Sequence, residues 1–254
     1  MMNPSTLSLI VFACIASGAL LGMFLRSTLP EHHLSADAKD VVRLGTGLIG
    51  TIAALVLGLL IASAKNSFDT QSTHIRQLTA NILLLDGLLA QYGPETRTAR
   101  DLLRRGIVTM TERIWREHTS DLAKAPPFEA SHGSEAFLET LQDLAPANEA
   151  QRSLKDRAIQ ASTELAKTRL LLFAEADNAI PMPFLAVLVF WLTIIFASFS
   201  LFAQPNVIVL SALVIFALSA AGAIFLILEL GRPFAGLMHI APEPLRHALA
   251  PLGP

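Results

Sequence analysis

Charged residues are scarce in this sequence. Asp, Glu, Lys and Arg make up 16% of the 254 residues, whereas an ordinary soluble domain carries about 25%. Hydrophobic residues make up 52%, and the mean hydropathy is +0.51. This composition excludes an ordinary soluble domain and indicates a membrane protein. The net charge is -2, and no segment of the sequence concentrates basic residues. We therefore expect no nucleic-acid partner.

Cysteine and catalytic motifs are also nearly absent. Cys14 is the only cysteine, which excludes an intrachain disulfide and a cysteine-based zinc site. The sequence contains no Gly-rich phosphate loop, no nucleophile elbow and no paired-carboxylate motif. We therefore expect no enzymatic activity, no catalytic residue, no cofactor and no metal. The segment PEHHLSADAKD, residues 30–40, gathers possible metal donors, but we interpret it as a helix start with Ser35 as the N-cap.

Long apolar runs are what the sequence does contain. Four runs reach the roughly 20 residues that a helix needs to cross a bilayer. The last two are joined only by Gln204-Pro205-Asn206, which predicts a helical hairpin. The fold class expected is an all-α membrane protein with four transmembrane helices. The four runs are 6–25, 44–64, 184–203 and 207–228.

The long central segment, 66–182, has helical periodicity but no run that could cross a bilayer. Apolar residues recur at alternating steps of three and four, the pattern of helices that pack along partners. We predict a cytoplasmic helical bundle inserted between the second and third transmembrane helices. Asp86 is either a solvated edge of this bundle or a polar residue that specifies its packing, and we favour the solvated edge. The resulting division is 1–65 for the first two spans, 66–182 for the bundle, 183–230 for the hairpin and 231–254 for a C-terminal segment.

The second span continues into the central segment without a helix-breaking residue. A single helix from about residue 35 to Tyr92 is predicted, roughly 85 Å long at ~1.5 Å per residue. Such a helix must extend beyond the bilayer core.

The distribution of Lys and Arg near the span ends predicts the orientation. The side that is richer in these cations is expected to face the cytoplasm, which places both termini and the bundle there. The cations compared are Lys65, Arg76, Lys167, Arg169, Arg232 and Arg246 on that side and Arg26, Lys39 and Arg43 on the other.

The second span carries small residues along one face, which we call the thin face. Small residues at four-residue spacing let transmembrane helices approach closely, and Gly18 and Gly22 give the first span a similar pattern. Packing between these two helices would account for the glycines. A thin face that ends in a cation also suits a helix that lines an oligomeric pore. The candidate pore-lining or helix-packing residues are Gly47, Gly50, Thr51, Ala54, Gly58, Ala62, Lys65 and Asn66.

Two further features lie at the end of the fourth span. Glu229 and Arg232 form a candidate charge pair at the membrane border, where an acidic residue is rare enough to be a functional candidate. The simpler interpretation is an interfacial anchor.

The C-terminal segment is short, proline-broken and partly amphipathic. It either lies on the membrane surface, packs against the bundle or forms a loose tail.

Several stretches resemble the bacterial bestrophin-like domain family. They are LGTGLIGTIAALVLGLLIASAKNSFDTQ, LLLDGLLAQYGPETRTARDLLRR, VLVFWLTIIFASFSLFAQPN and LILELGRPFAGL. The family is likened to bestrophin anion channels, and the resemblance implies a homopentamer with four membrane helices per subunit, cytoplasmic termini and a pore-lining second span. It places the chain in a bacterial inner membrane. Bestrophins carry bulky pore constrictions on this span, where the present sequence has Gly and Ala.

Two functional hypotheses follow from the sequence. In the first, the protein is a homo-oligomeric channel in the lipid bilayer whose second span lines a path for inorganic anions such as chloride. In the second, it is a non-conducting membrane scaffold or sensor that binds partners through its cytoplasmic bundle.

Overall fold

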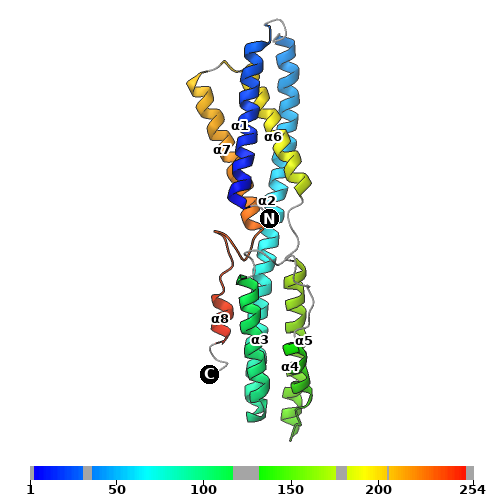
Figure 1. Ribbon diagram of the computed structural model, residues 1–254. Coiled ribbons are helices and arrows are strands. Elements are labelled where there is room, and N and C mark those ends of the chain that lie inside the picture. Colours follow the sequence, from blue (N-terminus) through cyan, green and yellow to red (C-terminus); the bar gives the residue numbers. More distant parts are fainter. Residues whose placement is uncertain (1–2, 31–35, 117–131, 176–181, 205, 250–254) are drawn as a thin grey trace. The chain divides into compact units, whose positions relative to one another are not determined.

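The computed structural model describes residues 3–30, 36–116, 132–175, 182–204 and 206–249. Every element within these ranges is helical, as the sequence predicts (Figure 1). The elements are α1 (Pro4–Thr28), α2 (Ala36–Tyr92), the short 3-10 helix η2 (Pro94–Thr96), α3 (Arg97–Arg116), α4 (His132–Gln142), α5 (Glu149–Glu175), α6 (Met182–Phe202), α7 (Val207–Leu230) and α8 (Glu243–Leu249).

The chain forms two compact units. Unit 1 comprises Met1–Asn66 and Ala179–Gly231, and unit 2 comprises Ser67–Asn178 and Arg232–Pro254. The helix α2 contributes its first part to unit 1 and its second part to unit 2. Its 57 residues confirm the single long helix that the sequence predicts.

The four predicted apolar helices are confirmed. The helices α1, α2, α6 and α7 are each long and apolar enough to cross a membrane. A backbone in hydrocarbon must satisfy its hydrogen bonds internally, and an uninterrupted α-helix does so. The protein is therefore a multi-pass membrane protein.

Within unit 1, α1 packs against α6 and α7 (Figure 1). Gly18 and Gly22 face α6 at close range. A Cβ atom added at Gly18 would lie 2.6 Å from the Thr193 carbonyl oxygen, and one added at Gly22 would overlap the Ala197 carbonyl oxygen. These two positions require glycine, because only a residue without a side chain lets the two backbones approach this closely.

Unit 2 has one hydrophobic core, which is built from the predicted helical stripes. The stripes on α2 and α3 are buried throughout, and parts of α4, α5 and α8 complete the same cluster. Residues three and four apart share one face of a helix, which is why a sequence stripe becomes a packed seam. The stripe residues are Ile75, Leu78, Ile82, Leu85, Leu89 and Tyr92 on α2, and Ala99, Leu103, Ile107, Met110 and Ile114 on α3.

A tight turn reverses the chain between α2 and α3. Gly93 adopts a φ of 135°, a conformation that disfavours any residue with a side chain. The Thr96 hydroxyl donates to the Leu89 carbonyl oxygen at 2.6 Å, and Gln151 Nε2 of α5 donates to the Tyr92 carbonyl oxygen at 3.0 Å. These side chains satisfy the carbonyl groups that the end of α2 leaves without helical partners.

The interpretation of Asp86 as a solvated edge is wrong. Its carboxylate is buried and forms a two-bond ion pair with Arg100 of α3, at 2.6 Å from Nε and 3.1 Å from Nη2. The hydrogen bond to Asp86 raises the pKa of the Arg100 guanidinium above its ordinary value, and burial opposes this only in part. This ion pair joins α2 to α3 beside the apolar core.

The C-terminal segment packs against unit 2, which is one of the three arrangements that the sequence left open. Phe234 is buried and meets Trp115 edge to face, with ring centroids 5.7 Å apart. The Trp115 indole N–H donates to the Ile240 carbonyl oxygen at 2.9 Å. Leu245 of α8 is also buried in the shared core. Residues 232–249 therefore belong to the folded unit.

Candidate functional site

The thin face of α2 lies at the surface of the chain. Gly47, Thr51, Ala54, Gly58 and Ala62 are all exposed, and Gly50 is half-buried. Lys65 and Asn66 follow on the same helix and are exposed as well. The structure thus brings all eight candidate residues together on one continuous helix.

The glycines of the thin face differ from those of α1 in what surrounds them. A Cβ atom added at Gly47 or Gly58 would meet no atom within 4 Å among the described residues, and one at Gly50 would only reach Ile195 Cδ1 at 4.0 Å. Close packing within the chain explains Gly18 and Gly22, but it does not explain Gly47 and Gly58. The open surface at these glycines is available to lipid or to a second copy of the chain.

A different face of α2 packs inside unit 1. Thr46, Ala53, Leu60 and Ala64 are buried, and the first three recur at seven-residue intervals. At 100° per residue this seam lies roughly 110° around the helix from Gly47. Sequence reasoning missed this seam, because its residues are less distinctive than the glycines. The seven-residue spacing is the signal that could have revealed it.

Large leucines border the thin face on the side away from the packed seam. Leu48, Leu55 and Leu59 are among the most exposed apolar side chains of the protein. In a membrane protein such side chains are suited to lipid contact or to a partner helix. The surface of α2 therefore has three strips in order: the packed seam, the thin face and the leucine row.

The candidate charge pair lies at the end of α7. Glu229 is only 3% exposed, and Arg232 is half-buried just beyond the helix. Burial of a carboxylate is costly unless polar groups surround it, so Glu229 is held by neighbours rather than by solvent. The pairing of Glu229 with Arg232 stays a prediction.

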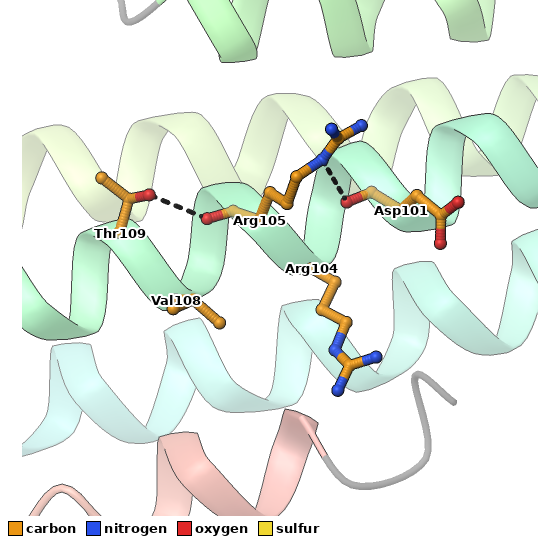
Figure 2. A pocket seen from close by; sticks show the side chains of 5 residues that line it. All are labelled: Asp101, Arg104, Arg105, Val108 and Thr109. Carbon is orange, nitrogen blue, oxygen red and sulfur yellow. Dashed lines mark hydrogen bonds between the residues drawn. The ribbon is translucent and has the colours of Figure 1, made fainter. Parts of the chain in front are cut away.

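A shallow hollow lies on the surface of α3 (Figure 2). Its lining residues, Asp101, Arg104, Arg105, Val108 and Thr109, all come from this one helix. Arg105 Nε donates to the Asp101 carbonyl oxygen at 3.3 Å, and the Thr109 hydroxyl donates to the Arg105 carbonyl oxygen at 3.0 Å. Figure 2 shows Arg104 and Arg105 extending in different directions, so they do not converge on one ligand position.

Arg169 of unit 2 is partly buried and lies within the electrostatic influence of Arg113. Arg169 of α5 donates from Nη1 to the Ser134 hydroxyl oxygen of α4 at 3.2 Å. Burial lowers the pKa of the Arg169 guanidinium, and the positive charge of Arg113 lowers it further.

Across the described ranges, no group of three His, Cys, Asp or Glu residues is placed to hold a metal ion. The segment 30–40 includes three possible metal donors that lie outside those ranges: Glu31, His32 and His33. The predicted N-cap Ser35 lies outside them as well.

Comparison with known proteins identifies the family. The family model for the Bestrophin-like domain matches residues 13–245, which is most of the chain. The protein therefore belongs to the Bestrophin-like domain family. No curated protein and no solved structure matches the chain.

Proposed function

We propose that the protein is a homo-oligomeric ion channel, selective for inorganic anions, in which α2 of each subunit lines the pore. The membership in the Bestrophin-like domain family supports this proposal, because bestrophins are anion channels of this plan. We propose a pentamer on the same resemblance. The membrane is the inner membrane of a bacterium, with both termini and unit 2 on the cytoplasmic side, as the Lys and Arg distribution favours.

The single observation that carries the proposal is the unused thin face. The chain uses the glycines of α1 for its own packing, while Gly47 and Gly58 of α2 face open space among the described residues. Glycine weakens a helix by about 1 kcal/mol relative to alanine, so a row of exposed glycines needs a reason outside the single chain. Close approach of symmetry-related α2 helices around an axis supplies that reason.

The charge at the end of the thin face supports anion selectivity. Lys65 is exposed on the same strip as Gly47 and Gly58, and Asn66 follows it. In a symmetric assembly, the copies of Lys65 would form a ring of positive charge at one mouth of the pore. Such a ring raises the local concentration of anions and disfavours cations.

Reversal of this charge tests the channel. We expect Lys65→Glu to shift the reversal potential in planar bilayer recordings under a salt gradient toward the cation equilibrium potential. The shift should weaken as salt increases, because the Debye length is ~10 Å at 0.1 M and shortens above that.

The matched control is Lys167→Glu, which reverses an exposed lysine on α5 rather than on α2. This variant should keep the selectivity of the wild type. Absence of wild-type conductance, or equal effects of the two reversals, would argue against a pore lined by α2.

Substitution on the thin face tests the assembly. We expect Gly58→Leu and Ala54→Leu to reduce the mass of the purified oligomer to that of the monomer, measured by light scattering in detergent. A leucine on this face separates backbones that small residues allow to touch.

The control for this experiment is Gly45→Leu. Gly45 is also exposed with open space around it, but it lies on a different side of α2 from Gly47. An unchanged oligomer mass in all three variants would mean that the thin face meets lipid.

The alternative function is a non-conducting scaffold or sensor. Unit 2 has its own hydrophobic core, and its surface exposes Leu83 and Leu84 side by side on α2. An exposed apolar pair on a folded helical unit suits contact with a partner helix. Flux measurements on liposomes containing the purified oligomer separate the two functions, since only the channel conducts.

A further inference from the structure

A groove in unit 1 lies between the start of α2 and the end of α6, which are at the same end of the unit (Figure 1). Charged residues of α2 form one side of the groove, and aromatic residues of α6 form the other. The lining residues that matter for its chemistry are Lys39, Asp40, Arg43, Thr46, Phe199 and Phe202.

The two cations of the groove share one face of α2. Lys39 and Arg43 are four residues apart, which places them one turn apart on the helix surface. Both side chains are exposed, and within the described ranges neither forms an ion pair. Both are therefore available to an anionic ligand in the groove.

The α6 side of the groove is apolar. Phe202 is half-buried, and Phe199 keeps 53% of its surface open, while Thr46 on the α2 side is only 7% exposed. A binding site with cations at its rim and phenyl rings beside them suits an amphipathic ligand with a charged head and an apolar tail.

The position of the groove along the helices narrows the choice of ligand. Lys39 and Arg43 immediately precede the apolar run 44–64, and Phe202 ends the apolar helix α6. These positions correspond to the border of the hydrocarbon core, where phospholipid headgroups lie. A phospholipid can thus place its phosphate near the cations and the start of an acyl chain against the phenyl rings.

We propose that this groove is a binding site for an anionic phospholipid with the chemistry of phosphatidylglycerol. The two cations and the one carboxylate of Asp40 leave the groove with one net positive charge, which a single phosphodiester neutralises. The glycerol hydroxyls of the headgroup can donate to the Asp40 carboxylate. Phosphatidylcholine offers neither a net negative charge nor a donor, so it binds more weakly.

The proposal also explains an irregularity in the sequence. Lys39 and Arg43 lie on the side that the Lys and Arg distribution assigns to the exterior, where cations next to a span are disfavoured. Binding of an anionic headgroup gives these two cations a function at that surface. The site is independent of whether the protein conducts ions.

Native mass spectrometry of the full-length protein can test the site. Dioleoyl phosphatidylglycerol, dioleoyl phosphatidylcholine and inorganic phosphate are the three probes. The wild type should retain phosphatidylglycerol in preference to the other two. The double variant Lys39→Gln/Arg43→Gln should weaken phosphatidylglycerol binding by about tenfold or more, because each cation near a membrane surface contributes to the attraction.

Two further variants test the parts of the site separately. Asp40→Asn should strengthen retention of phosphatidylglycerol, because it removes a negative charge beside the phosphate while its amide oxygen still accepts a hydrogen bond from the glycerol hydroxyls. Phe199→Ser should weaken phosphatidylglycerol binding while leaving the response to inorganic phosphate unchanged. All these side chains are exposed, so the thermal unfolding temperature should stay the same.

Arg26→Gln is the matched control, because Arg26 is a cation at the same membrane border that does not line the groove. It should bind phosphatidylglycerol like the wild type. Equal losses in Arg26→Gln and in the double variant would overturn the proposal. Retention of phosphatidylcholine as strong as that of phosphatidylglycerol would also overturn the proposal. Inorganic phosphate binding as tightly as either lipid would do the same.

Discussion

Replacement of Asp86 by alanine is expected to lower the free energy of unfolding by about 3 kcal/mol. The substitution leaves the Arg100 guanidinium partly buried without the carboxylate that accepts two of its hydrogen bonds. Breaking a buried ion pair from one side costs ~3–5 kcal/mol, and the 27% exposure of Arg100 places this case at the lower end. Chemical unfolding of the purified protein in detergent, followed by circular dichroism, measures the change.

A double-mutant cycle with Arg100→Ala isolates the interaction from other effects of the substitutions. The pair of single variants should lose more stability in sum than the double variant loses. Glu149→Ala is the control, because it breaks the ion pair between Arg152 and Glu149, at 3.3 Å, in which both side chains are largely exposed. That exposed pair should contribute little. Equal losses of unfolding free energy at Asp86 and Glu149 would mean that the buried ion pair stabilises the protein no more than the exposed pair does.

Gly22→Ala is expected to destabilise unit 1 by about 2 kcal/mol, the typical cost of forcing an extra group into a packed interior. The added methyl group would overlap the backbone carbonyl of Ala197 on α6, and backbone cannot move aside as a flexible side chain can. The helices α1 and α6 would have to separate locally. A lower thermal unfolding temperature of the purified protein would record this effect.

Gly47→Ala provides the matched comparison on α2. Both substitutions add one methyl group at a helical glycine in a transmembrane segment, but the methyl at Gly47 enters open space. The stability of the subunit should therefore not fall, and the helix should gain slightly from alanine. A larger loss at Gly47 than at Gly22 would contradict the packing described for the two helices.

Much of the fold could be predicted from local sequence patterns. The long helix α2 was predictable because no proline interrupts residues 36–92, and helix propensity acts over neighbouring residues. The buried stripes from Ile75 to Tyr92 and from Ala99 to Ile114 were predictable for the same reason, since residues three and four apart must share a face. The apolar runs predicted the membrane helices because length and hydropathy alone decide whether a segment can span a bilayer.

The candidate site was only half predictable. The sequence identified the thin face, because small residues on one side of an apolar helix are visible as a pattern. It could not tell which glycines pack inside the chain, since the patterns at Gly18 and Gly22 and at Gly47 and Gly58 look alike. Gly18 and Gly22 meet α6, whose residues lie far along the chain, whereas Gly47 and Gly58 meet no atom within 4 Å among the described residues.

The sequence by itself determined the helices, their apolar faces and the membrane class of this protein, because these follow from interactions within about two helical turns. Only the tertiary structure decided how the faces are used. It pairs Asp86 with Arg100 across the Gly93 turn, packs the C-terminal segment against Trp115 and, in the part of the chain described, leaves Gly47 and Gly58 of α2 open. Such pairings depend on which helices meet and at what rotation, and the packing of side chains from distant segments sets both.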